Sequence, residues 1–514
     1  MTQITGLPEL LGLAGLDIDV VEREADGTWT AHVTTAGGPN RCCPDCRQPS
    51  DRDKDFTTHS VKHLVVTPVL ATWHKARFWC DNSDCETMVF VETGPIESDA
   101  AVSAHAKTVM GHLVGDWMVP VSRVAGAAGV AWHTAHDAFV DVATDAGIRI
   151  TDTGAPGATT LDTGAPDSGT PDTGAPDSGG ATNTAAGDDL PDSGDTSDIP
   201  SVRACRSVTG SLPPVTVLGI DDHRRGRPLY HRNPLTGSWV ADADRWASVF
   251  VDSGGGHGLL GQVEGRAAAD VTTWLTAQNP GWLAGITHVT IDMSTVYASA
   301  VRAALPNATL VVDLFHIVQL ANKVVGDVRR RVTHEHYGRR GHTDDPEYAI
   351  RNLLVRNADT LSRTARHKIL CTLADLGDHG RQLGAAWRAK ELVRGLTRLS
   401  PNQTGHAATR DKVGKALETI YTFAATTGAT IPEVVTLTET ISTWRAEITR
   451  GVLTGHNNAT AEGVNRLIKL VYRTAFGFTN VTNQQRRSRY AASRTTRPNW
   501  LHPVTDNPPQ PVAT

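Results

Sequence analysis

Residues 287–319 read THVTIDMSTVYASAVRAALPNATLVVDLFHIVQ, and this stretch decides the fold of the chain. Two short apolar runs, HVTI and ATLVV, end at Asp292 and Asp313, and a helical pattern lies between them. The pattern predicts one βαβ unit, in which two parallel strands flank a helix. A carboxylate at the end of a buried strand is costly unless it is paired, hydrogen-bonded or bound to a metal. Two such acids in one unit therefore indicate a functional role.

A third acid follows an apolar run upstream, and a fourth lies far downstream. Asp221 comes directly after VTVLGI, which predicts another strand that ends in a carboxylate. In HNNATAEGVNRLIKLVYRTAFGF, Glu462 lies at the start of a predicted helix. Asn465, Arg466 and Lys469 follow Glu462 at spacings of about one helical turn, so they can share its face.

Two strand-end aspartates and a helical glutamate suit two-metal phosphoryl transfer. Carboxylate oxygens bind Mg²⁺ or Mn²⁺, and two such ions about 4 Å apart activate an attacking hydroxyl and stabilise the leaving oxygen. Each acid taken alone is more simply explained as a helix cap or a surface charge. Their order along the predicted strands and helix favours the metal site.

Five of the seven cysteines lie between positions 42 and 85. The segments RCCPDCRQPS and FWCDNSDCETMVF supply Cys43 with Cys46 and Cys80 with Cys85, which is the spacing of a four-cysteine zinc site. The stretch between the two pairs reads as two strands, so the segment predicts a small zinc ribbon. Cys42 is an alternative ligand to Cys43, and a set of cytosolic thiols is the competing interpretation.

The stretch VPVSRVAGAAGVAWHTAHDAFVD, residues 119–141, predicts two short helices. Gly129 falls where a tight turn would separate them, as in a DNA-binding helix-turn-helix. The second helix would then expose a set of mostly polar side chains: Trp132, His133, Thr134, His136 and Asp137. This face carries few basic groups, so an ordinary helical hairpin is an equal alternative.

The composition changes sharply between residues 151 and 200, which carry ten Asp and no Glu, Lys or Arg. A ten-residue unit, DTGAPDSGTP, recurs there with variations. Such a segment has almost no apolar side chains to bury, so it predicts an extended linker. The chain has a net charge of −6, and without this segment it is +4. A mildly basic remainder is compatible with DNA binding, although it is not diagnostic.

The sequence contains no apolar stretch long enough to span a bilayer, so no membrane association is expected. Its first residues, MTQITGLPELLGLAGLDIDV, lack a basic region and contain acids, unlike a secretory signal. We therefore expect a cytoplasmic protein.

Three blocks resemble the ISL-three family of bacterial insertion-sequence transposases: LGIDD, IDMSTVYASAVRAALPNATLVVDLFHIVQLANKVVGDVRR and TAEGVNRLIKLVYRTAFGFTN. The resemblance covers most of the chain outside the acidic linker and the tail. It implies an α/β, RNase H-like catalytic domain with a helical insertion, preceded by a small zinc ribbon and a helix-turn-helix. The long repeated linker departs from the family pattern and puts in question how rigidly DNA-end recognition is coupled to cleavage.

The resemblance implies that Asp221, Asp292 and Glu462 form the catalytic DDE triad and bind Mg²⁺ or Mn²⁺. Family members commonly carry an Asp-Glu pair after the first strand, and Asp222 fills the Glu position here. We favour Asp221 as the ligand, because alternation along a strand would point Asp222 away. Asp313 belongs to the recurring DLFH block.

His316 completes that block, and we expect Asp313 and His316 to support the site by hydrogen bonding rather than to complete the triad. Downstream, Arg466, Lys469 and Arg473 are candidate DNA phosphate contacts. The more distal arginines are interpreted as a solvated basic face: Arg486, Arg487 and Arg489.

The expected organisation has seven segments. They are a zinc ribbon (1–95), a helix-turn-helix segment (96–148), an acidic disordered linker (149–205), the first part of the RNase H-like core (206–325), a helical insertion (326–450), the last core helix with its glutamate (451–490) and a disordered tail (491–514).

The resemblance implies a transposase that binds terminal inverted repeats and catalyses metal-dependent cleavage and strand transfer. Its partners would be double-stranded DNA, at the transposon ends and the target, and further copies of itself on that DNA; in a bacterium it would work at the nucleoid. Two alternatives remain. One is a catalytically silent, transposase-derived DNA-binding regulator, and the other is an RNase H-like nuclease that acts on structured nucleic acid.

Overall fold

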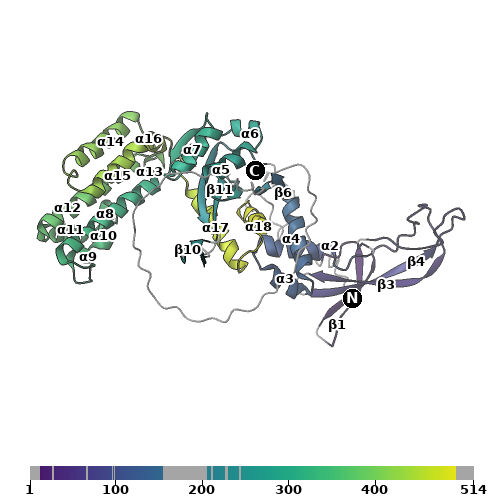
Figure 1. The fold of residues 1–514 in the computed structure, drawn as a ribbon. Coiled ribbons are helices and arrows are strands. Elements are labelled where there is room, and N and C mark those ends of the chain that lie inside the picture. The colour runs from purple at the N-terminus through teal and green to yellow at the C-terminus, as the bar shows by residue number, and fades with distance from the viewer. Residues whose placement is uncertain are drawn as a thin grey trace, which may run out of the picture.

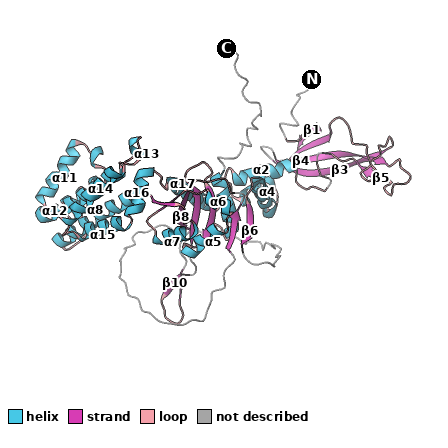
Figure 2. Ribbon diagram, turned by 90° about the horizontal axis from the view of Figure 1, so that it is seen from above, coloured by secondary structure: helices cyan, strands magenta, loops and turns pink. Residues whose placement is uncertain are grey.

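The structure is a computed structural model. It describes residues 12–25, 28–64, 68–94, 96–97, 99–153, 205–209, 212–225, 230–241 and 245–493. Most of the predicted acidic linker and of the predicted tail lies outside these ranges, as do residues 1–11. Within them, no helix combines the length and the apolar character that crossing a membrane requires. Figures 1 and 2 show a helical bundle at one end, a mixed sheet in the middle and a second sheet at the other end.

The N-terminal sheet has five strands: β1 (Leu16–Arg23), β2 (Trp29–Thr35), β3 (Asp53–Leu64), β4 (Pro68–Trp79) and β5 (Val89–Val91). The strand order is β1-β2-β4-β3, and β5 pairs with β4. Strands β2 and β4 are parallel, and the other pairs are antiparallel. Val33, Val61 and Trp73 form part of its buried core. The long β3–β4 hairpin carries the chain from the first cysteine pair to the second.

Three helices follow: α2 (Ala104–Gly115), α3 (Val121–Ala128) and α4 (Trp132–Asp145). Gly129 ends α3 in the left-handed region, with φ of 63°, which a glycine adopts without strain. Ala125, Ala135 and Phe139 are buried between the helices. The turn between α3 and α4 therefore lies at the predicted glycine.

The central sheet contains β8 (Val217–Arg224), β11 (Trp246–Asp252), β12 (Leu259–Glu264), β13 (His288–Ile291) and β14 (Thr309–Val312). Its order is β12-β11-β8-β13-β14, with antiparallel pairs on the β12 side and parallel pairs on the β14 side. Between β8 and β11 the chain forms a two-stranded hairpin, β9 (Tyr230–Arg232) and β10 (Trp239–Ala241).

One face of the central sheet is covered by α5 (Ala268–Thr276), α6 (Pro280–Ala284) and α7 (Thr295–Ala304). The other face packs against α17 (Ala459–Thr474) and α18 (Val481–Ser493), through apolar contacts that include Val249, Val464 and Ile468. The sheet is therefore buried on both faces, which explains why its strands read as nearly continuous apolar runs.

The helical part begins with the 24-residue helix α8 (Leu314–Tyr337). It continues through short and long helices: α9 (Pro346–Ala349), α10 (Arg351–Leu354), η1 (Ala358–Thr360), α11 (Arg363–Asp375), α12 (Gly377–Thr397), α13 (Pro401–Thr404), α14 (Arg410–Ala425), α15 (Pro432–Thr443) and α16 (Arg445–Thr454). The expected boundary at residue 326 falls inside α8. One buried cluster runs from the central sheet into these helices, so the two parts share a core.

The interpretation of Arg486, Arg487 and Arg489 as a solvated face is wrong. All three lie on α18 and are only 8%, 5% and 8% exposed. The Arg487 guanidinium donates hydrogen bonds to the carbonyl oxygens of Val114 and Val119, at 3.1 and 2.9 Å. The reason is tertiary: α18 packs between the central sheet and the three-helix segment, a position that a basic sequence does not reveal.

Tyr490 of α18 forms the centre of this contact. Its ring meets that of Phe139 edge-on, with 5.5 Å between centroids, and its hydroxyl donates to Asp116 at 3.3 Å. A Cβ atom on Gly115 would lie 2.4 Å from the Tyr490 ring, so the glycine makes room for it. The three-helix segment is thus fastened to the central sheet through α18.

The two ends of the predicted linker also differ from the expectation of 149–205. Its first residues form β6 (Arg149–Thr153), and its last residue begins β7 (Cys205–Thr209); the two strands pair with each other antiparallel. In this register Thr153 lies opposite Cys205. The chain therefore leaves and rejoins the described structure at one place. Pairing across some fifty intervening residues is non-local, so local composition cannot indicate it.

Candidate functional site

Three of the predicted acids, all aspartates, lie together at one edge of the central sheet. The parallel register of β13 with β8 places Thr290 opposite Gly219, so Asp292 follows beside Asp221. On the other side β13 pairs with β14, and Asp313 follows that register in the same way. The three aspartates therefore belong to three neighbouring strands: Asp221 lies in β8, and Asp292 and Asp313 directly follow β13 and β14. The expectation that Asp221 ends its strand is wrong, because β8 continues to Arg224 through pairing with β11 alone.

Asp221 and Asp222 point to opposite faces of the sheet. The Asp221 carboxylate accepts a hydrogen bond from the side-chain amide of Asn465 on α17, at 2.8 Å. The Asp222 carboxylate accepts one from the hydroxyl of Tyr297 on α7, at 3.3 Å. Of the two neighbours, Asp221 lies on the side of the sheet where Glu462 is found.

Three polar side chains from α17 and from the residue directly before it face the edge of the central sheet: Asn458, Glu462 and Asn465. Asn458 donates its side-chain amide to the Ile220 carbonyl at 3.3 Å, and its oxygen lies 3.3 Å from the Thr290 hydroxyl. Asn465, seven residues or about two turns further along, contacts Asp221. Glu462, four residues after Asn458 and three before Asn465, shares this face of the helix. Its carboxylate is also 3.4 Å from the Arg466 guanidinium.

Asp313 is held by the ends of two helices. It caps α8 by accepting a hydrogen bond from the backbone N–H of Phe315 at 3.0 Å. Its second oxygen accepts from the backbone N–H of Asn458 at 3.2 Å, directly before α17. These two contacts occupy both carboxylate oxygens and fix the start of α17 relative to β14.

Burial and mutual repulsion raise the pKa values of Asp221 and Asp292. Burial raises the pKa of Asp221 to about 6, and the nearby Asp292 and Asp222 carboxylates add to this rise. Burial likewise raises the pKa of Asp292, an effect that the neighbouring His316 opposes. His316, in the first turn of α8, thus lies within electrostatic reach of both aspartates. A cation bound between the acids would relieve their repulsion.

Two oxygen atoms of this cluster fit such a cation. Oδ1 of Asp292 and Oδ1 of Asn465 are both buried without a hydrogen-bond partner. Buried polar atoms are normally satisfied, so each exception needs an explanation. Oxygen donors of this kind are the preferred ligands of Mg²⁺ and Mn²⁺. These two oxygens are therefore of the type that a hard divalent cation binds, although among the described residues only the cysteine set brings three or more His, Cys, Asp or Glu ligand atoms close together as it stands.

A basic stripe lies on the solvent side of α17. Arg466, Lys469 and Arg473 are exposed and recur at intervals of three and four residues, which places them on one face. At the start of the stripe, the Arg466 guanidinium lies 3.4 Å from the Glu462 carboxylate. This stripe therefore borders the acidic cluster.

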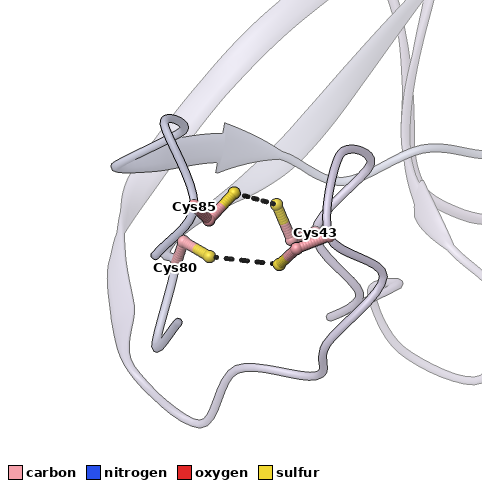
Figure 3. A group of neighbouring side chains, drawn as sticks. Cys43, Cys80 and Cys85 are labelled. Atoms are coloured by element: carbon pink, nitrogen blue, oxygen red, sulfur yellow. Dashed lines mark hydrogen bonds between the residues drawn. The ribbon is translucent and has the colours of Figure 1, made fainter. Parts of the chain in front are cut away.

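The four predicted cysteines converge in the N-terminal sheet. The sulfur atoms of Cys43, Cys46, Cys80 and Cys85 all lie within 4.8 Å of one another, so they could hold a metal ion. Figure 3 shows three of these side chains pointing together. The sulfurs of Cys43 and Cys85 are 3.9 Å apart. Tetrahedral zinc with Zn–S bonds of about 2.3 Å requires sulfurs about 3.8 Å apart, so the set fits zinc.

The four thiols differ in acidity. A backbone N–H of Gln48 lowers the pKa of Cys46 to about 7, which favours the thiolate that a metal requires. Burial and the neighbouring thiols raise the pKa of Cys80 and of Cys85, and a coordinated metal ion would deprotonate both. The cluster packs against Phe78 and Phe90. The thiol of Cys42, the alternative ligand, is exposed and lies outside the cluster.

The exposed positions predicted for the second short helix occupy the first turns of α4. Trp132 is 51% exposed and stacks on His136 with 4.8 Å between ring centroids. His133 and Asp137 are exposed as well, whereas Thr134 is half-buried. The face is therefore accessible, although it carries no Lys or Arg.

Sequence reasoning missed Asn458 and Tyr297 as parts of the site, and it gave Asn465 only a place on the helix. The one local signal is the pair Asn457-Asn458 directly before the helix, a composition typical of a helix start. Nothing local indicates that Tyr297 on α7, 75 residues further along the chain, reaches Asp222.

Comparisons with known proteins agree with this arrangement. The family model of the ISL-three DDE transposases, described as "Transposase", matches residues 219–488, which is more than half of the chain. Over 123 residues the chain is 36% identical to the transposase for insertion sequence element IS1001 of Bordetella parapertussis. That alignment covers 23% of this chain and 29% of that protein.

Among solved structures, the Drosophila P element transposase strand transfer complex is similar at 8% identity and a TM-score of 0.29, covering 55% of this chain and 77% of that one. This similarity is too low to support an argument about the fold. The family match contains Asp221, Asp292 and Glu462. The chain belongs to the ISL-three family of DDE transposases.

Proposed function

We propose that this protein binds the terminal inverted repeats of an insertion sequence and catalyses metal-dependent DNA cleavage followed by strand transfer. The observation that carries the proposal is the convergence of Asp221 and Asp292 beneath the helix face that bears Glu462, with unpaired oxygen atoms among them. The order of the central sheet, antiparallel on one side of β8 and parallel on the other, supports an RNase H-like core.

Asp221, Asp292 and Glu462 would hold the metal. Mg²⁺ or Mn²⁺ bound there would activate the attacking hydroxyl and stabilise the leaving oxygen. Asn465 orients the Asp221 carboxylate through its amide, and Asp313 fixes the first turn of α17. These contacts would keep the ligands in place while a DNA phosphate is exchanged.

The remaining elements would supply DNA binding. The cysteine cluster would hold structural zinc, and its sheet and the α3–α4 pair would recognise the terminal repeats. Arg466, Lys469 and Arg473 would contact phosphates next to the acids, adding affinity rather than sequence preference. Two DNA ends must be joined to a target, so we expect a homo-oligomer on DNA, working at the bacterial nucleoid.

A cleavage and joining assay tests this function. The full chain would be incubated with DNA that carries the inverted repeats flanking its gene, with Mg²⁺ and without it. The proposal predicts Mg²⁺-dependent nicks at the repeat boundary and joining of the freed 3′-hydroxyl ends to target DNA. Repeat binding without any nick would favour a silent regulator. Preferential cutting of branched or hybrid substrates would favour a nuclease.

A further inference from the structure

A groove of about 480 Å³ opens directly beside the acidic cluster. Asp313 and Glu462 line one end of it, and Arg394 and Arg398, near the end of α12, line the other. Its remaining wall comes from the first turn of α8, the loop before α17 and α13. The groove therefore connects the proposed catalytic acids with the helical part, which otherwise has no assigned task.

The walls of the groove combine a flat apolar surface with amide groups. Phe315 lines it and is 49% exposed, although it is a phenyl ring in the first turn of a helix whose other face is buried. Asn357, Asn402 and Gln403 line the groove as well. Such side chains can both donate and accept hydrogen bonds, as the edge of a nucleobase requires.

The charge of the groove suits a phosphate at its outer end. The Arg398 side chain is 54% exposed, and it pairs at 2.8 Å with Asp359, itself 43% exposed. An exposed ion pair of this kind is weak, so a phosphate could replace the partner. Arg394 contacts the same Asp359 and Glu391 and is only 10% exposed, so it would stay fixed.

The size of the groove selects its occupant. A volume of about 480 Å³ lies in the lower part of the range for small-molecule sites, roughly 300–1,000 Å³. It can hold about one nucleotide but not a duplex. One carboxylate oxygen of the half-buried Asp292 is fully buried, and a DNA strand that departs from regular duplex geometry could approach this carboxylate more closely than a regular duplex.

Resting on the proposed function, we infer that the groove receives one nucleotide of the DNA strand that is cut, turned out of the duplex. Its base stacks on Phe315, and its flanking phosphate faces Arg398. The scissile phosphate, on the other side of that nucleotide, then lies at Asp313 and Glu462, next to Asp292. Stacking on an aromatic ring would offset the loss of stacking in the duplex.

The test places 2-aminopurine, which brightens when unstacked, at each of the nucleotides next to the cleavage site in turn. With the full-length protein and Ca²⁺, fluorescence should rise several-fold at one position only, because contact with the single Phe315 ring quenches 2-aminopurine less than stacking between two neighbouring bases does. Phe315→Ala should cut fully paired DNA about ten-fold more slowly than wild type, whereas an abasic site at that position should restore most of the rate. Phe315→Trp should behave like wild type.

Leu370→Ala is the matched control, because it removes an exposed apolar side chain from the helical part outside the groove. Its cleavage rate should equal that of wild type, and thermal unfolding should show all variants folded. A free mononucleotide should not compete with DNA; competition that depends on Phe315 would assign the groove to a soluble nucleotide and overturn the inference.

The two proposals fail differently. If wild-type protein cuts the ends but no position brightens, and Phe315→Ala cuts paired and abasic DNA at the same reduced or full rate, the groove inference is wrong and the proposed function stands. If wild-type protein cuts no end DNA, the proposed function fails and the groove inference falls with it.

Discussion

The chain builds two clusters of side chains for which we propose metal binding, and they differ in how completely they are closed. In the N-terminal sheet, four sulfur atoms lie within 4.8 Å of one another and pack against Phe78 and Phe90. At the edge of the central sheet, the oxygens of Asp292 and Asn465 lack partners, and a groove opens beside Glu462. The first cluster leaves no position for a substrate, whereas the second does.

This difference separates a structural role from a chemical one. Four cysteines would complete the coordination of a zinc ion, so an ion bound there would only hold the sheet together. A carboxylate cluster with free oxygens is unfavourable as it stands, because its members are buried and repel each other. Such an arrangement persists when its strain serves a function.

Removing one acid should have the largest effect on activity and little effect on folding. Asp221→Asn should lower the cleavage rate by roughly 10³-fold or more. Its stability should be unchanged or higher, because a neutral amide is easier to bury than a carboxylate. Asp222→Asn, on the opposite face beside Tyr297, should change the rate by less than about ten-fold. Equal losses in both variants would contradict the assignment of Asp221.

Removing one cysteine of the cluster should have its main effect on folding and metal content rather than on the chemical step. Cys43→Ser should lose the metal, because it removes one of the four thiolate ligands. The loss should be costly, because structural zinc contributes roughly 10–16 kcal/mol in small zinc-binding peptides. The N-terminal sheet should then unfold separately at lower temperature, and DNA-end binding should weaken. Cys42→Ser, which removes an exposed thiol outside the cluster, should keep one zinc per chain. Zinc content and calorimetry check both variants.

The acidic cluster should make stability depend on pH when Mg²⁺ is absent. The pKa of Asp221 is about 6 in the folded protein, above its ordinary value of 3.8, so the folded state holds this proton more tightly. The carboxyl therefore stabilises the fold below about pH 4 and loses that contribution as the pH rises through 6, at most about 3 kcal/mol.

Urea unfolding in Mg²⁺-free buffer without a chelator, so that zinc stays bound, measures this dependence. Asp221→Asn should flatten the curve between pH 4 and 7, and Mg²⁺ should restore stability to the wild type above pH 6. If the free energy of unfolding depends on pH in the same way for wild type and for Asp221→Asn, the pKa of Asp221 is not raised in the folded protein.

A smaller effect is expected where α18 joins the three-helix segment. In Gly115→Ala the new methyl group would press on the Tyr490 ring, which should cost about 1–3 kcal/mol. Cleavage of DNA ends should fall while binding of the isolated repeats persists, because the contact of α18 with the three-helix segment positions the proposed DNA-binding helices relative to the proposed catalytic acids. Gly126→Ala, at a glycine with open space around its Cβ position, is the control.

The smallest effect should come from removing the acidic linker. Thr153 and Cys205 already face each other, so residues 154–204 can be replaced by a four-residue Gly-Ser turn. Shortening the loop should stabilise the β6–β7 pair by up to about 2 kcal/mol. Cleavage should stay within about two-fold of wild type. A large loss would mean that the linker itself takes part in the reaction.

The sequence was informative where the signal is local. Apolar runs that end in acids predicted β8, β13 and β14, and cysteine spacing predicted the sulfur cluster. It failed where contacts cross the chain: the burial of Arg487 on α18, the pairing of β6 with β7, and the core shared by the central sheet and the helices. The polar contacts of Asn458 likewise depend on strands more than 160 residues away.

The most direct test of the central claim compares wild type with Asp292→Asn on end DNA, measuring binding and nicking in the same samples. We expect both proteins to bind the end DNA equally and only wild type to make Mg²⁺- or Mn²⁺-dependent nicks at the repeat boundary. Equal nicking by both proteins, or nicking that needs no divalent metal, would contradict it.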